Sequence, residues 1–100
     1  MLNVSNEACY NHAKYLEYCY INNDIQEILI EANTAIKYLT SIDIMIYDDL
    51  FNLKTVVYSY ILLPLLYCKY ISESILHELL NIDTKFDILN LINKIKSLLA

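Results

Sequence analysis

Two pairs of residues have a spacing that could place metal ligands on one face of a helix. Cys9 and His12 are three residues apart, and Glu73 and His77 are four apart. A structural zinc site needs four ligands, but no second cysteine–histidine pair repeats the first. Helical di-iron sites place glutamate three residues before histidine, where this chain has Cys9 and Ser74 instead. We therefore expect neither metal nor cofactor.

The Cys9–His12 pair has a simpler interpretation, as a buried thiol beside a half-exposed histidine. An apolar environment raises the pKa of a thiol, whereas a nucleophilic cysteine needs positive neighbours that lower it. The chain contains no glycine and no arginine. It therefore lacks the glycine-rich loops that hold phosphates and the side chain best suited to bidentate phosphate recognition. We predict that the protein is not an enzyme. A metal- or thiol-dependent enzyme using Cys9 and His12 stays as an alternative.

The charge of the chain restricts its partners. The formal net charge is -5 and the isoelectric point is about 4.7, so nucleic acids are repelled and basic partners are favoured. An acidic decoy that inhibits a nucleic-acid-binding protein is a further alternative. The most apolar stretch, residues 55–68, is shorter than the ~20 residues of a membrane span. We expect no membrane contact, no secretory signal, and a cytoplasmic location with reduced cysteines.

The apolar residues recur at helical spacing along the whole chain, in five segments. These segments are residues 6–21, 24–40, 43–62, 65–80 and 84–99. Loops of two to four residues make successive helices antiparallel neighbours. We expect asparagine at 22 or 23, and at 81, to take the left-handed positions that glycine usually fills. The sequence thus predicts an all-α fold, a compact antiparallel bundle of five helices forming one domain over residues 1–100.

Pro64 decides how the middle of the chain is divided. A straight helix over residues 43–80 would be about 57 Å long at 1.5 Å per residue, more than twice the length of its partners. We therefore favour a break or sharp bend at Pro64, with four helices if the chain continues through a kink. The segment 43–62 is apolar on nearly all sides, except for a polar strip of Asp48, Asn52, Thr55 and Ser59. This predicts the central helix of the bundle.

The ten tyrosines are the most informative residues for function. Tyr20 and Tyr60 fall on apolar helix faces, which predicts core positions. Other aromatic and aliphatic residues fall on or near polar faces, where tyrosine and isoleucine without neighbouring charge are typical of association surfaces. The predicted interface residues are Tyr15, Tyr18, Ile30, Tyr38, Tyr67 and Tyr70.

These observations favour a non-catalytic protein–protein interaction module, either a homo-oligomer or a small subunit of a larger assembly. The partner is a protein or a second copy, not a nucleic acid or a membrane. Ile, Leu, Asn, Lys and Tyr dominate the composition, which is typical of an AT-rich genome. The sharper form of the hypothesis is therefore a viral or parasite factor that binds a host protein.

Overall fold

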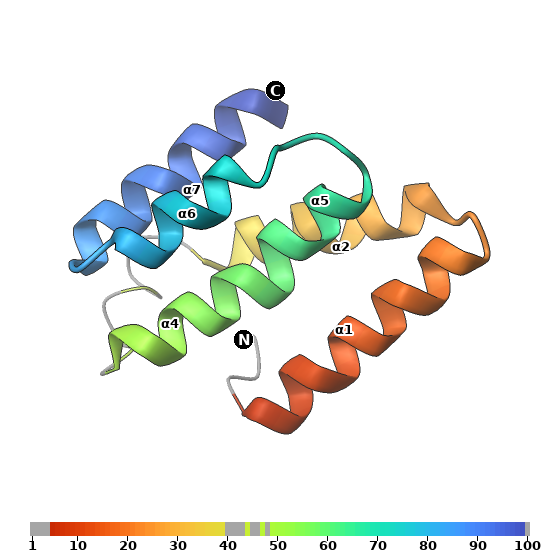
Figure 1. Ribbon diagram of the computed structural model, residues 1–100, viewed down its shortest axis with the longest axis horizontal. Helices are drawn as coiled ribbons and strands as arrows, with labels where there is room; N and C mark the ends of the chain where they lie inside the picture. The colour runs from red at the N-terminus through yellow and green to blue at the C-terminus, as the bar shows by residue number, and fades with distance from the viewer. Residues whose placement is uncertain (1–4, 40–43, 45–46, 48, 100) are drawn as a thin grey trace.

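The longest helix lies in the middle of the molecule and runs from Leu50 to Tyr67 (Figure 1). The computed structural model describes residues 5–39, 44, 47 and 49–99. In it the central helix has three consecutive pieces: α4 (Leu50–Val57), a π-helical piece (Tyr58–Leu62) and α5 (Leu63–Tyr67). By length and composition this helix could cross a membrane, a property that core helices of soluble proteins share. Here its buried side chains form the centre of a hydrophobic core.

Four further helices surround the central one in the described ranges. They are α1 (Asn6–Ile21), α2 (Ile25–Tyr38), α6 (Ser74–Asn81) and α7 (Lys85–Leu99). In Figure 1, α1 lies on one side of the central helix and α6 and α7 lie on the other, while α2 passes behind the central helix. The predicted all-α bundle of five helices is confirmed, with the two middle segments joined by the π-helical piece.

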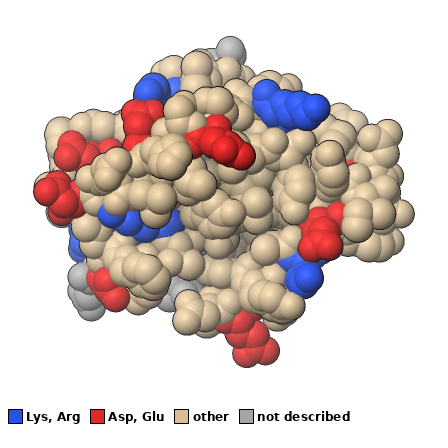
Figure 2. All heavy atoms as spheres, in the orientation of Figure 1, with Lys and Arg blue, Asp and Glu red and all other residues tan. Residues whose placement is uncertain are grey.

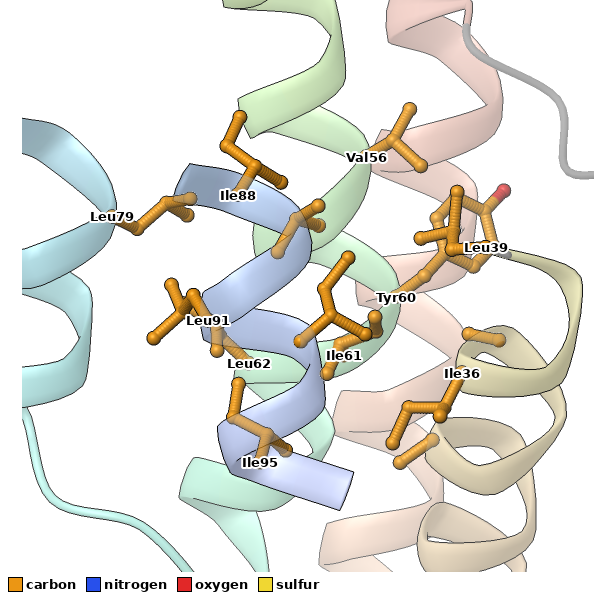
Figure 3. Close-up of a cluster of buried hydrophobic side chains, with 14 of the residues drawn as sticks. Ile36, Leu39, Val56, Tyr60, Ile61, Leu62, Leu79, Ile88, Leu91 and Ile95 are labelled. Carbon is orange, nitrogen blue, oxygen red and sulfur yellow. The ribbon is translucent and has the colours of Figure 1, made fainter. Parts of the chain in front are cut away.

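Most of the helices meet in one large hydrophobic core. Figure 3 shows Ile88, Leu91 and Ile95 of α7 pointing toward Ile61 and Leu62 of the central helix. Leu79 from α6, Ile36 from α2 and Leu39 directly after α2 complete the same cluster. A smaller cluster of Leu16, Cys19 and Ile28 attaches the last turns of α1 to the start of α2 and to α5. The end of α1 is therefore held by a separate and smaller set of contacts.

Helices α1 and α5 both end in a Schellman turn, the motif that normally uses glycine. After α1, Asn23 N–H donates to Tyr20 O at 3.1 Å and Asp24 N–H donates to Cys19 O at 2.8 Å. Asn23 has the required positive φ of 59°, as the sequence predicted. The Asp24 side chain then accepts from Glu27 N–H and caps α2, so three residues reverse the chain.

The second Schellman turn lies where the sequence predicted a continuous helix over residues 65–80. Lys69 N–H donates to Leu66 O at 3.1 Å, and Tyr70 N–H donates to Leu65 O at 3.0 Å. Lys69 has a φ of 60°, whereas Asn81, expected in that conformation, remains helical. The helix predicted over 65–80 is therefore wrong: the chain leaves it after Tyr67 and starts α6 at Ser74.

Pro64 does not break the helix, because the turn before it is widened. Proline lacks an N–H and its ring clashes with the carbonyl four residues earlier. Leu63 N–H donates to Tyr58 O, five residues back, in the pattern of a π-helix. The helix consequently passes through Pro64, which was the alternative to the favoured break.

The π-helical piece also changes which residues are buried. It is contacted by α1, α2 and α6, so Ser59 of the predicted polar strip lies in the interior at 6% exposure. Of the rest of that strip, Asn52 is exposed, Thr55 is half-buried, and Asp48 lies outside the described residues. Tyr60 is buried at 9%, as predicted.

Tyr20, the other tyrosine predicted in the core, is 47% exposed, so that prediction is wrong. Its ring rests against the ring of Tyr67 at a centroid distance of 4.9 Å, at the edge of the contact between α1 and α5. The core position on this part of α1 is taken instead by Cys19.

We predict that Lys69→Gly stabilises the fold. A residue with a Cβ pays roughly 1–2 kcal/mol in the left-handed conformation, partly offset by the greater freedom of glycine in the unfolded chain. We expect the free energy of unfolding to rise by about 1 kcal/mol, measured by urea titration. The control is Lys96→Gly, inside α7, which we expect to lower it by up to about 1 kcal/mol. A destabilising Lys69→Gly would contradict this account of the turn.

Candidate interaction surfaces

Five of the six predicted interface residues are exposed. Tyr18 is 64% exposed and Tyr15 41%, while Ile30, Tyr38 and Tyr70 are each about half exposed. Tyr67 is half-buried. Exposure leaves these side chains available for a partner, and their role in an interface remains a prediction.

Tyr15 and Glu27 join the outer sides of α1 and α2. The Tyr15 hydroxyl donates to Glu27 Oε1 at 3.0 Å. Hydrogen bonds with Cys19 and Glu27 raise the pKa of the Tyr15 phenol, so it stays protonated near neutral pH. Ile30 lies one turn after Glu27 on α2. We use the name hairpin face for the exposed Tyr15, Tyr18, Ile30 and Tyr38 of this helix pair together with the half-buried Glu27 and Glu31.

The hairpin face is acidic at its centre. Burial, and then the neighbouring Glu27 carboxylate, raise the pKa of Glu31. The two glutamates are four residues apart, where like charges repel each other. A positive group placed between them would relieve this repulsion, which gives the face a preference for a basic partner.

Tyr67 and Tyr70 do not share a helix face, contrary to the predicted outward side of a 65–80 helix. Tyr67 ends α5 and packs against Tyr20, and burial raises the pKa of its phenol. Tyr70 is the last residue of the Schellman turn and lies outside the helix. A shallow pocket of about 290 Å³ is lined by Tyr20, Tyr67, Lys69 and two leucines, Leu63 and Leu66.

A second surface, which the sequence reasoning missed, is an apolar groove between α4 and α6. It has a volume of about 360 Å³. We call it the α4–α6 groove. Its lining residues are Phe51, Lys54, Thr55, Tyr58, Leu76, Leu79 and Leu80. Figure 2 views the molecule with α4 and α6 in front, and most of this side is uncharged.

Two of the groove residues are among the most exposed apolar side chains of the described chain: Phe51 at 70% and Leu80 at 61%. The α4 wall could have been found from the sequence, because Phe51, Thr55 and Tyr58 follow a helical spacing of four and three residues. The α6 wall could not have been found in this way, because its position depends on the turn at Lys69, which the sequence did not predict.

A further pocket lies between α6 and α7, and most of the residues that line it are polar or charged. It has a volume of about 540 Å³, and His77, Glu78, Asp87 and Lys94 are among its lining residues. Lys94 Nζ donates to both carboxylate oxygens of Glu78, at 3.1 and 3.2 Å. Within the described ranges, no group of three His, Cys, Asp or Glu side chains is arranged to hold a metal ion.

Cys9 and His12 are placed as the sequence predicted, the thiol buried and the histidine half-buried. The His12 ring stacks on the ring of Tyr60, with centroids 4.2 Å apart and planes at 22°. His12 Nε2 is inaccessible and has no hydrogen-bond partner in the part of the chain that the structure describes. Burial lowers the pKa of this imidazole, so His12 is a neutral ring that packs α1 against the central helix.

Comparison with protein-family models, curated proteins and solved structures found no match to this chain.

We predict that His12 makes the fold less stable at acid pH. Because burial lowers its pKa in the folded state, the unfolded chain binds the proton more readily. The free energy of unfolding should therefore fall as pH drops below about 6.5, the ordinary pKa of histidine, and continue falling to the folded-state pKa. Glu31, with a raised pKa, acts in the opposite direction, losing stability as pH rises above its ordinary range.

The test compares urea unfolding at several pH values for the wild type, His12→Phe and His77→Gln. Phenylalanine keeps a ring on Tyr60 but cannot be protonated, so the fall below about pH 6.5 should be reduced. His77→Gln removes an exposed imidazole and is the control for the loss of a histidine side chain. An unaltered pH profile in His12→Phe would contradict the prediction.

Proposed function

We propose that this protein is a non-catalytic protein–protein interaction module, a small subunit of a larger assembly or a factor that binds another protein. Two exposed surfaces support this proposal. One is the hairpin face, and the other is the α4–α6 groove, whose walls keep Phe51 and Leu80 largely in water. Burying a large apolar side chain contributes about 1.5–3 kcal/mol. A partner that covers both residues would gain that free energy, and the fold itself does not use it.

The hairpin face supports a partner different from the chain itself. Residues 5–39 carry five carboxylates, Glu7, Glu17, Asp24, Glu27 and Glu31, but only two lysines, Lys14 and Lys37. In a two-fold dimer through this face, equivalent surfaces would meet and their like charges would repel. A basic partner protein would instead find attraction around the exposed tyrosines. This favours the subunit or host-binding form of the proposal over the homo-oligomer.

The test measures association of the wild type and of a variant with Ile30→Ser and Tyr38→Ser. We expect the wild type to co-purify stoichiometrically with a basic protein from its native cells, and the variant to bind that protein about tenfold more weakly or less. Binding should weaken as salt is added, because exposed charges are screened.

The matched control is Leu98→Ser, at an exposed apolar position on α7, which should bind as the wild type does. Circular dichroism checks that all variants fold, and sedimentation reports self-association. A strict monomer that binds no protein, or a partner bound equally well by Ile30→Ser/Tyr38→Ser, would count against the hairpin face.

A further inference from the structure

The two walls of the α4–α6 groove are helix faces rather than loops. On the central helix, the spacing is three, one and three residues for Phe51, Lys54 and Thr55 of α4 and Tyr58, the first residue of the π-helical piece, so they lie on one side of the helix. On α6, Leu76 and Leu80 are one turn apart, with Leu79 buried. The groove therefore runs between two helices, with apolar side chains along both.

Two polar side chains in the groove, Lys54 and Thr55, are already hydrogen-bonded. The Thr55 hydroxyl donates to Phe51 O at 3.0 Å, and Lys54 Nζ donates to Leu80 O at 3.1 Å. The backbone of both walls is helical, so most of its N–H and C=O groups are used within the helices, and Leu80 O is occupied by Lys54. An extended segment laid in the groove would leave its own backbone groups unpaired, at a cost of roughly 1–3 kcal/mol for each buried group. A helix satisfies its backbone internally and avoids this cost.

Lys54 is the charged residue that lines the groove, and its charge is not neutralised. Its hydrogen bond is with a neutral carbonyl, and no carboxylate of the described residues pairs with it. The side chain is half-buried beside Phe51 and Leu80, where a charge interacts more strongly than in open water. A carboxylate on the bound helix would pair with this ammonium group.

We propose that the α4–α6 groove binds an amphipathic helix of a partner protein, through apolar side chains on one face and a carboxylate that meets Lys54. This inference rests on the proposed interaction function and names the class of partner for this surface. Helices bind grooves of this kind through apolar anchors repeated at three- and four-residue spacing.

The test is a selection from a displayed library of helical peptides. The apolar positions are held at a spacing of three and four residues, and one flanking position is randomised. Binders selected on the wild type should be enriched in Asp or Glu at the randomised position. On a Lys54→Glu variant the preference should change to Lys or Arg, because the charge of the groove is reversed.

Individual peptides are then measured by fluorescence anisotropy. Phe51→Ser and Leu80→Ser should each weaken binding about tenfold or more. Both residues are mostly exposed, so the fold should tolerate these changes, as circular dichroism would verify. The control is Phe86→Ser, which is 68% exposed on α7 and does not line the groove; it should bind as the wild type does.

Three outcomes would overturn the inference. One is a selection that yields no binder, and another is a set of binders unaffected by Phe51→Ser and Leu80→Ser. The third is a wild-type dimer in sedimentation that Leu80→Ser dissociates, since a second copy would then occupy the groove. After any of these outcomes, the Ile30→Ser/Tyr38→Ser variant still tests an interaction through the hairpin face. Failure of helix binding in the groove is therefore distinguishable from failure of the proposed function.

Discussion

The helix from Leu50 to Tyr67 must be covered along most of its surface, and the other helices are arranged to do this. Leu53, Val57, Ile61 and Leu65 are fully buried on it. No one helix can cover a surface of that width, because a helix contacts another along one stripe. Four amphipathic helices therefore surround it, each with a single apolar side toward the centre and a polar or aromatic side toward water. Pro64 remains inside this helix because the preceding turn is widened rather than broken.

The absence of glycine constrains how the surrounding helices are connected. Both Schellman turns need a residue with positive φ, and the chain supplies Asn23 at one and Lys69 at the other. Asparagine tolerates this conformation better than most residues, whereas lysine has no such advantage. The first turn is followed at once by the Asp24 cap, so α1 and α2 form a tight antiparallel pair. The second is followed by residues 70–73 before α6 begins.

The sequence predicted features that depend on one helix at a time. The bounds of α1, α2 and α7 follow from a repeating apolar stripe, and the exposure of Tyr18 and Tyr38 follows from their place opposite that stripe. The end of α5 could not be predicted in this way, because neither glycine nor proline marks the turn and the apolar spacing continues past it. The burial of Ser59 could not be predicted from the sequence either, because it results from contacts with several neighbouring helices.

The turn at Lys69 determines whether the α4–α6 groove exists. If α5 continued through residue 80, Leu76 and Leu80 would extend beyond Tyr67 and away from α4. Because the chain reverses, Leu80 instead returns to the first turns of α4, where Lys54 bonds its carbonyl oxygen. The same reversal leaves the groove, with its single lysine, apart from the acidic α1–α2 pair in the bundle (Figure 1). The two surfaces differ in charge as well as in place, so a partner suited to one is poorly suited to the other.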